Sequence, residues 1–433
     1  MIINRENVSY LLFIATIIFP FLTLGDTVYT NIYYYIVIIY FLFERNLLIK
    51  FLKNFFENNI LKILFFFLIF FLLYNIYISE NITLTLSRII NIFKYSFVCI
   101  CLIYLLKKYK KLNFYISISA FGLIIFICLD LLYELYFGSD IFSNNSAYKN
   151  MTRLAGPFGG ELIPGTILKM FVFISLFTLM EFIDVKYKNV IIVSCLIIIG
   201  FFIFLTGERT SFIMFCFGSF IYFILLIYYK SKSKIYFYSI IISLILILSI
   251  FLSILYLNYK AIKENETNIF TRQLSSIETI QNFKTSRYFA HFYTSYSLWE
   301  KRPLLGYGFK SYRIVCDQIN LDDLKKYNKQ DHCSTHPHNY YLEVLVEGGI
   351  ILLLLILLLE YLFYKKIYKI VMLYRNSEIN YLFIGSLITC IILFWPFATT
   401  SSLFSTQIGN SFFFILAICY SNFSNILNKE TEK

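Results

Sequence analysis

Long apolar runs, separated by short polar connections, make up most of this chain. Twelve of the runs can cross about 30 Å of hydrocarbon as helices. They lie near residues 8–24, 29–43, 60–78, 86–106, 112–137, 162–182, 189–205, 210–229, 235–258, 341–363, 380–397 and 403–421. The pattern predicts an all-α polytopic membrane protein with about twelve transmembrane helices.

The connections between the runs alternate in charge. Basic connections follow the second, fourth, sixth, eighth and tenth runs, at "ERNLLIKFLKN", "KKYKK", "DVKYKN", "KSKSK" and "KKIYKIVMLYR". The alternate connections "SENITLT", "TGERT" and "PFATTSS" carry one basic residue among them. Lys and Arg concentrate in cytoplasmic loops, so the alternation predicts that both termini are cytoplasmic.

Two connections on the predicted outer side are longer than the others, residues 138–161 and residues 259–340. Long loops without structure of their own are uncommon, so we expect the second to fold as a mostly helical cap between the ninth and tenth helices. The expected organisation is a membrane domain with nine helices in residues 1–258, the cap in 259–340, and three further helices with a cytoplasmic tail in 341–433.

Composition supports a membrane protein. The 433 residues are 59% hydrophobic and 15% charged, whereas soluble domains are about 45–50% apolar and about 25% charged. The net charge of +12 resides largely in the short basic loops, so we expect membrane lipids and no nucleic acid as partners. The segment "GYGF" lacks the strand–turn–helix setting of a phosphate loop, and no nucleotide cofactor is implied.

The cysteines are divided between the predicted spans and the large outer loop. Seven lie in predicted spans, where Cys behaves as a small hydrophobe: Cys99, Cys101, Cys128, Cys195, Cys216, Cys390 and Cys419. Cys316 and Cys333 both fall in the large outer loop. In an oxidising compartment they are candidates for a disulfide worth roughly 3 kcal/mol; the alternative is two unpaired thiols.

Ionisable residues gather near the outer ends of the predicted helices, where burial of a charge is costly. They are Arg88, Lys94, Asp130, Glu134, Lys169, Arg209, Glu343 and Glu347. With a rise of about 1.5 Å per residue, Lys94, Asp130 and Lys169 fall at roughly the same depth. One interpretation is a buried ion-pair network that stabilises the bundle. The other is a polar vestibule, open outward, that receives a charged headgroup.

Two arginines are candidates for binding an anion. Arg209 occupies the tight turn "LTGERTSF", and its guanidinium group matches phosphate oxygens; the alternative is snorkelling to the interface. Arg287 starts the segment "RYFAHFYTSYSLWEKRPLLGYGF", which predicts an amphipathic helix that ends before Pro303. Aromatic and polar positions recur in it at helical spacing: Tyr288, Phe292, Ser295, Tyr296 and Trp299. A cation at a helix start opposes the helix dipole, and an anionic ligand would compensate it.

Histidines occur at the entrance to an apolar helix, in "STHPHNYYLEVLVEGG", residues 334–349. Three interpretations remain open. His336 and His338 could join His332 and Cys333 in a metal site, although the spacing is loose. His338 and Asn339 could cap the following helix. A neutral imidazole at the membrane surface could also remove a proton from an attacking hydroxyl.

Taken together, these motifs resemble the O-antigen ligase and O-antigen polymerase superfamily. The Arg after "TG", the Arg before the helix that ends "RPLLGYGF", and "HPHNYYLEVLVEGGI" occur in the family's order. "RLAGPFGGELIPG", residues 153–165, is similar to the family's segment before a span.

The resemblance implies a membrane enzyme that transfers a glycan from an undecaprenyl diphosphate carrier to an acceptor hydroxyl on the periplasmic face of the bacterial inner membrane. It implies that Arg209 and Arg287 bind the diphosphate and that His338 is the catalytic base, although His336 remains an alternative. Residues in possible supporting positions are His336, Asn339, Arg153, Lys94, Asp130 and Lys169. Direct, inverting displacement without metal or other cofactor is expected.

The candidate functions differ in the acceptor that receives the glycan. A ligase would use lipid A–core, whereas a polymerase would extend the growing glycan on its carrier; the short 138–161 loop favours the ligase. Protein glycosylation is a further possibility. A transporter or flippase would instead place ionisable groups at the bilayer midplane and show related halves, and neither pattern is evident in the sequence.

Overall fold

The structure is a computed structural model. It describes residues 5–25, 27–44, 46, 49, 59–144, 153–159, 161–230, 269, 273, 286–319, 332–373, 380–398, 402 and 406–431. Within these ranges the regular structure is helical and contains no β-strand. The prediction of an all-α fold is therefore confirmed for the described part of the chain.

Eleven of the twelve predicted runs coincide with helices. These helices are α1 (Arg5–Leu22), α2 (Thr27–Phe43), α4 (Asn59–Ile78), α5 (Ile82–Lys108), α6 (Leu112–Phe137), α7 (Pro164–Phe182), α8 (Lys188–Leu205), α9 (Arg209–Lys230), α14 (Tyr340–Leu373), α15 (Tyr381–Leu393) and α16 (Thr406–Thr431). The ninth run, 235–258, lies outside the described residues. Six helices among the described residues, α5 to α9 and α14, are long and apolar enough to span a membrane. The count of twelve spans therefore stays a prediction.

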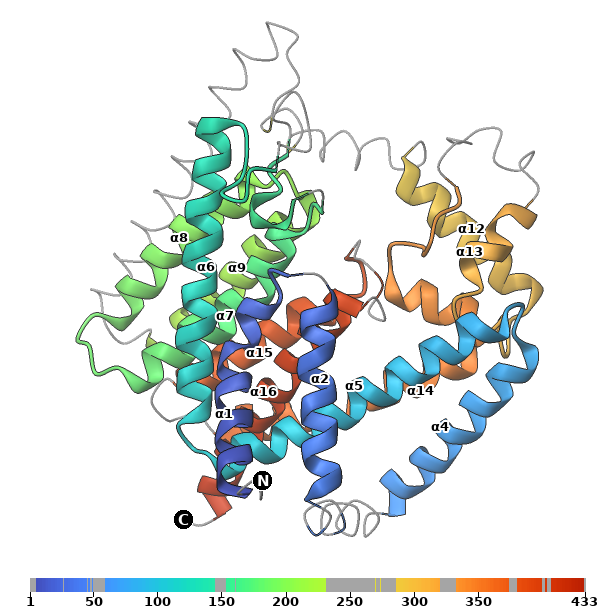
Figure 1. Ribbon diagram of the computed structural model, residues 1–433, viewed down its shortest axis with the longest axis horizontal. Coiled ribbons are helices and arrows are strands. Elements are labelled where there is room, and N and C mark those ends of the chain that lie inside the picture. Colours follow the sequence, from blue (N-terminus) through green and yellow to red (C-terminus); the bar gives the residue numbers. More distant parts are fainter. Residues whose placement is uncertain are drawn as a thin grey trace, which may run out of the picture.

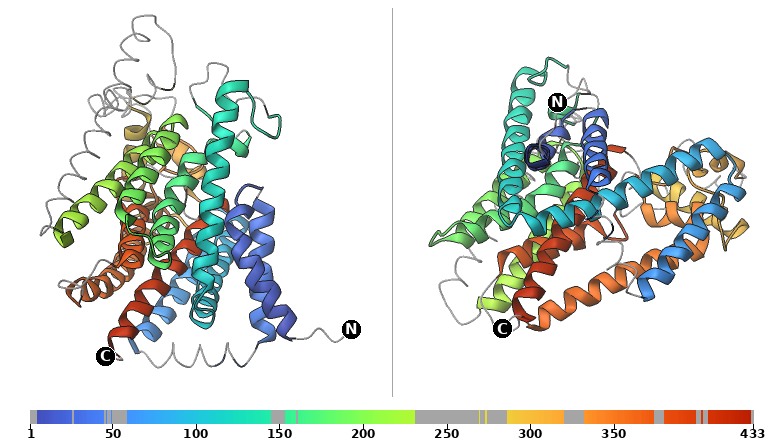
Figure 2. Two further views of the ribbon diagram at one scale, coloured as in Figure 1. Left: turned by 90° about the vertical axis from the view of Figure 1, so that its left-hand side faces the viewer. Right: turned by 60° about the horizontal axis from the view of Figure 1, so that its bottom comes forward.

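Part of the structure is a bundle around α7, and α4 and α14 extend to one side of it (Figure 1). Helix α7 contacts α6, α8, α9, α15 and α16, and its side chains from Pro164 to Met180 are mostly buried. A helix that is apolar on all sides belongs in the interior of such an assembly. The start of α1 and the end of α16 lie at the same end of the bundle, away from the cap formed by α12 (Arg287–Lys301) and α13 (Tyr312–Val315) (Figures 1 and 2).

Hydrogen bonds between polar side chains join the helices within the bundle. Asn422 of α16 donates to Ser386 of α15 at 2.9 Å and accepts from Asn113 of α6 at 2.7 Å. Asn189 of α8 accepts the hydroxyl of Tyr381 at 2.8 Å. Such bonds fix the relative orientation of helices where the surrounding apolar phase gives no hydrophobic driving force.

The structure corrects one predicted boundary. The basic segment that starts at Lys365 was expected to form a loop after the tenth run, but α14 continues as a helix to Leu373. Long Lys side chains can extend toward the polar side while their stems stay on apolar surface. A helix can therefore continue through a basic segment that hydropathy assigns to a loop.

The amphipathic helix predicted before Pro303 is confirmed as α12, but most of the positions that recur at helical spacing are not on its buried face. Tyr296 is 49% exposed, and the other predicted positions apart from Ser295 are half-buried. The buried positions are Ala290, His291, Thr294, Ser295 and Leu298. Small and polar residues line this face because α12 packs directly against α14, where large aromatic rings would hold the two helices apart.

The start of α14 is interlocked with the segment after α12. Gly349 has φ 65° and interrupts the helix. Four backbone hydrogen bonds then join α14 to residues 303–308: Tyr307 to Val346 (3.1 Å), Gly308 to Glu347 (2.9 Å), Ile350 to Pro303 (2.9 Å) and Ile351 to Leu304 (3.3 Å), with the donor named first. The sequence segments "RPLLGYGF" and "VEGGI" are therefore in direct contact.

Substituting Gly349 by alanine is expected to destabilise the protein by more than about 1–2 kcal/mol, since a side chain is unfavourable at this φ. A β-carbon there would also collide with the carbonyl group of Leu304 and the nitrogen of Leu305. Thermal unfolding in detergent checks this expectation. Gly122→Ala in α6 is the matched control, because its β-carbon would meet Phe21 at 3.6 Å, an ordinary contact. Equal unfolding temperatures for the two variants would contradict the close contact between Gly349 and the segment after α12.

Candidate active site

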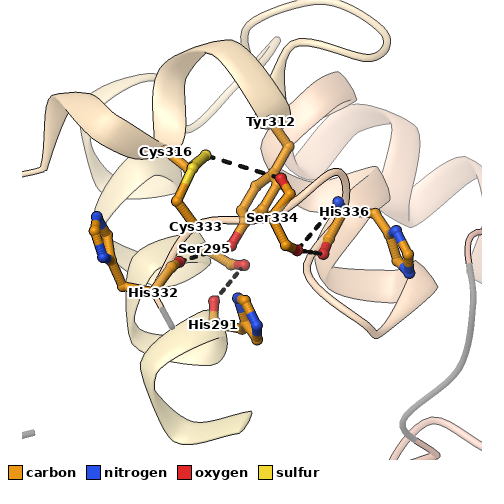
Figure 3. Close-up of a disulfide and its surroundings, with 8 residues drawn as sticks. All are labelled: His291, Ser295, Tyr312, Cys316, His332, Cys333, Ser334 and His336. Atoms are coloured by element: carbon orange, nitrogen blue, oxygen red, sulfur yellow. Dashed lines mark hydrogen bonds between the residues drawn. A yellow bond between two sulfur atoms is a disulfide. The ribbon is translucent and has the colours of Figure 1, made fainter. Parts of the chain in front are cut away.

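The cap has a small core of its own beside the head of α14. Its members are Leu298, Tyr307, Tyr312, Val315, Cys316, Ile319 and Val346. Tyr312 donates its hydroxyl hydrogen to the carbonyl oxygen of His332 at 3.4 Å, so the segment before α14 is held against α13 (Figure 3). Burial raises the pKa of Tyr312, so its hydroxyl stays a neutral donor.

Cys316 and Cys333 form a disulfide, with Cα atoms 5.2 Å apart. The bond joins the 3₁₀ turn η3 (Cys316–Gln318) to the histidine segment. Asp317 completes the one group of potential metal ligands found among the described residues. Because the disulfide uses both sulfur atoms, it excludes thiolate coordination by this group in the oxidised form.

Replacing Cys316 by serine is expected to lower the free energy of unfolding by about 3 kcal/mol, because the disulfide closes a short loop. Thermal unfolding of the variant, with non-reducing peptide mass spectrometry of the wild type, checks this. Cys216→Ala is the control, since Cys216 is an exposed free cysteine in α9. Alkylation of Cys316 and Cys333 in the native, unreduced protein would contradict the expectation.

Three imidazole rings meet where the cap joins α14. The ring of His338 lies 4.4 Å from that of His336 and 5.0 Å from that of His291, measured between centroids. The ring of Tyr288 is nearly perpendicular to that of His338, with the centroids 6.5 Å apart. His338 has φ 55°, a conformation uncommon for a residue other than glycine. The cluster therefore centres on His338, the predicted base.

Asn339 caps the helix. Its side-chain oxygen accepts the backbone N–H of Leu342 at 3.1 Å. Its amide nitrogen donates to the carbonyl oxygens of Pro396 (2.7 Å) and Ala398 (3.3 Å). Asn339 thus satisfies one of the orphan N–H groups of α14 and ties the histidine segment to the loop after α15.

A buried ion pair lies one turn into α14. Arg88 of α5 pairs with Glu343 at 3.0 Å, and their side chains are 2% and 1% exposed. Ser402 accepts from Arg88 at 3.1 Å and donates to Glu343 at 2.8 Å. Glu347 lies close enough to Arg88 for their charges to interact. The arrangement ties α5, α14 and the segment before α16 together beneath the histidine cluster.

Side chains near the C-terminal end of α4 and the N-terminal end of α5 form hydrogen bonds with the loop between α12 and α13. Asn75 accepts the backbone N–H of Phe309 at 2.8 Å, and Thr85 donates to the carbonyl oxygen of Phe309 at 2.9 Å. Arg302 pairs with Glu80 at 3.1 Å on the partly exposed side. Burial, with the charges of Arg88 and Arg313, lowers the pKa of Lys310 in this loop.

A second polar cluster occupies the turn between α8 and α9. Glu208 accepts hydrogen bonds from the backbone N–H of Gly165 (2.7 Å) and the hydroxyls of Thr166 (2.8 Å) and Ser211 (2.9 Å). Arg153 and Lys169 lie within electrostatic range of its carboxylate. Burial raises the pKa of Glu208 despite these donors.

Arg209 follows Glu208 directly and starts α9. Two predicted site residues, Arg153 and Lys169, are therefore gathered around one acid, and a third, Arg209, is the neighbour of this acid in the chain. Helix α9 connects this cluster to the histidines indirectly. Its Phe217 packs against Trp395 with ring centroids 4.6 Å apart, and Trp395 precedes Pro396, the partner of Asn339.

Lys94 and Asp130 have separate neutral partners. Lys94 donates to Asn31 at 2.6 Å and lies 4.9 Å from the ring centroid of Tyr95. Asp130 accepts the backbone N–H of Ile141 at 2.8 Å, which fixes the loop after α6. The structure thus does not join Lys94, Asp130 and Lys169 in one network, and the network interpretation fits Arg88 and Glu343 instead.

The sequence pattern predicted some residues of this region and not others. Arg287 stands at the first position of α12 as expected; its side chain lies outside the described part. His291, one turn later, was not singled out, because it lies off the aromatic stripe of α12. The spacing of four residues between Arg287 and His291, which puts both on one helical face, was the available signal.

These features define the class of protein: a polytopic helical membrane protein whose histidine-bearing cap is seated on the head of a long apolar helix. Residues 194–357 match the family model described as O-antigen ligase, and this match confirms the predicted resemblance to the O-antigen ligase and polymerase superfamily. The matched range includes Arg209, Arg287, His291 and His338. No curated protein matches the chain.

Proposed function

We propose that this chain is an O-antigen ligase-like glycosyltransferase of the bacterial inner membrane. The observation that carries the proposal is the histidine cluster around His338, at the junction of a membrane helix and the cap. One substrate would arrive in the membrane as an undecaprenyl diphosphate-linked glycan. The other, lipid A–core, would present its hydroxyl from the periplasmic side.

In this proposal His338 removes the proton of the acceptor hydroxyl as the hydroxyl oxygen attacks the anomeric carbon. The bond from that carbon to the diphosphate breaks, and its electron pair stays on the diphosphate. Arg209 and Arg287 bind the leaving diphosphate, where developing charge makes their contribution larger in the transition state than in the ground state. Attack opposite the leaving group inverts the anomeric centre, with no metal required.

The supporting residues differ in how they would contribute to the reaction. Arg153 and Lys169 add positive charge beside Arg209, and Glu208 balances part of it. Asn339 holds the histidine segment in place, and His336 lies beside His338. Lys94 and Asp130, which bind neutral groups in the bundle, would act on its packing instead of on substrate.

The proposed topology has both termini in the cytoplasm and residues 259–340 in the periplasm. The alternating basic loops support it, and so does the position of the cap at the end of the bundle away from the start of α1 and the end of α16 (Figure 2).

A reconstituted transfer assay tests the function. Purified protein in liposomes receives undecaprenyl diphosphate glycan and lipid A–core, and products are separated by acceptor. Glycan on lipid A–core is the expected result. Longer glycan on the carrier, with lipid A–core unmodified, would mean a polymerase. Movement of the donor across the bilayer without transfer would overturn the proposal in favour of a flippase.

A further inference from the structure

His291 is the member of the histidine cluster with no role in the mechanism above. It is on the buried face of α12, and its side chain is only 4% exposed. Ser295 donates a hydrogen bond to its backbone oxygen at 2.7 Å, and α12 packs against α14. The imidazole is therefore enclosed by the cap and shielded from solvent.

The spacing of the rings permits a direct interaction with His338. The two centroids are 5.0 Å apart, and the ring planes are inclined by 55°. Two imidazoles that share a hydrogen bond of about 3 Å between ring nitrogens have centroids about 5 Å apart. The centroid distance of 5.0 Å therefore leaves room for a nitrogen-to-nitrogen contact between the two rings.

His336 is the other neighbour of His338 but is less suited to this interaction. Its Nδ1 already lies 3.0 Å from the hydroxyl of Thr335, and its side chain is only half-buried. His291 is more deeply buried, and an interaction with a charged partner is stronger where water is excluded.

We propose that His291 is a positioning residue that accepts a hydrogen bond from one ring N–H of His338. This contact selects the tautomer of His338 whose other nitrogen faces the acceptor hydroxyl. It also stabilises the imidazolium that forms when His338 takes up the hydroxyl proton. The inference rests on the proposed function for its catalytic meaning, but the contact itself can be tested without activity.

Two substitutions separate positioning from packing. In His291→Gln the amide oxygen can still accept the hydrogen bond, whereas in His291→Phe the ring fills the space but has no acceptor. We expect the Phe variant to lose about tenfold or more in kcat, since a wrong tautomer removes the base, with KM for the lipid-linked donor unchanged. The Gln variant should retain most of the wild-type kcat. The reverse order would mean that His291 only packs, and would overturn the proposal.

A chemical readout makes the test independent of transfer. Diethyl pyrocarbonate acylates the unprotonated imidazole nitrogen, and mass spectrometry locates the product. The peptide that carries His338 also carries His332 and His336 as internal references. His338 should react several-fold more slowly in His291→Phe than in the wild type and at a near-wild-type rate in His291→Gln. Equal rates in all three proteins would overturn the inference even if transfer is observed.

The two readouts distinguish the possible failures. If the wild type transfers no glycan but His338 reactivity follows residue 291, the proposed function fails and the contact stands. Should the Phe variant fail to fold, as judged by gel filtration in detergent, His291→Leu serves as the apolar comparison in both measurements.

Discussion

Replacement of His338 by asparagine is expected to reduce glycan transfer by about 10²–10⁴-fold, the contribution of a positioned general base. Asparagine is the informative substitution because it tolerates the left-handed conformation that His338 adopts at φ 55°. Alanine would add backbone strain to the loss of the imidazole. The measurement is kcat in reconstituted liposomes, together with the unfolding temperature, which should not change.

The matched variant His336→Asn decides which histidine is the base. His336 lies within 4.4 Å of His338 between ring centroids, so both substitutions disturb the same cluster. We expect a smaller loss for His336→Asn than for His338→Asn. A large loss for His336→Asn with a nearly active His338→Asn would exchange the roles of the two histidines.

Substitution of Arg88 by alanine is expected to destabilise the protein by about 3–5 kcal/mol, because it leaves a buried carboxylate without its cation. Glu343 would lose the 3.0 Å ion pair, and Ser402 would lose its donor. Glu347 is buried nearby and would no longer be balanced by the guanidinium charge. Chemical or thermal unfolding in detergent gives the measurement.

The double variant Arg88→Met, Glu343→Met is the control for this effect. Apolar replacement of both members of a buried ion pair is often neutral, so the double variant should recover much of the lost stability. An additive loss in the double variant would show that the two side chains contribute independently, contrary to the pairing described.

The helices were largely predictable because each apolar run imposes its own secondary structure. Backbone groups in hydrocarbon must be hydrogen-bonded internally, so a run such as 112–137 has little alternative to forming α6. Helix ends were less predictable. Helix α14 continues through a basic segment to Leu373, since hydropathy records where a residue prefers to lie and not where hydrogen bonding stops.

The site was predictable only where its residues are close in sequence. His336, His338 and Asn339 share one segment, and their proximity follows from the chain itself. Lys94, Asp130 and Lys169 were grouped by depth, but depth along a helix does not fix the direction of a side chain around its axis. Lys94 consequently meets Asn31, and Asp130 meets the backbone of Ile141.

His291 illustrates the same limit on α12. The aromatic positions predicted one face, and the close approach of α14 selected another, with Ala290, Thr294 and Ser295 inside. A sequence pattern reports the chemistry of each face but not the distance of the neighbouring helix. That distance decides whether large or small residues are buried.

The backbone hydrogen bonds between residues 303–308 and α14 have a consequence for exchanging parts between related enzymes. A chimera joined at Tyr340, where the membrane helix begins, would combine a loop from one protein with a helix from another. The four hydrogen bonds between residues 303–308 and α14 would then join residues that did not evolve together. A segment that keeps these four bonds together runs from Pro303 through Ile351. A graft of the loop should therefore carry the first turns of the membrane helix along with it.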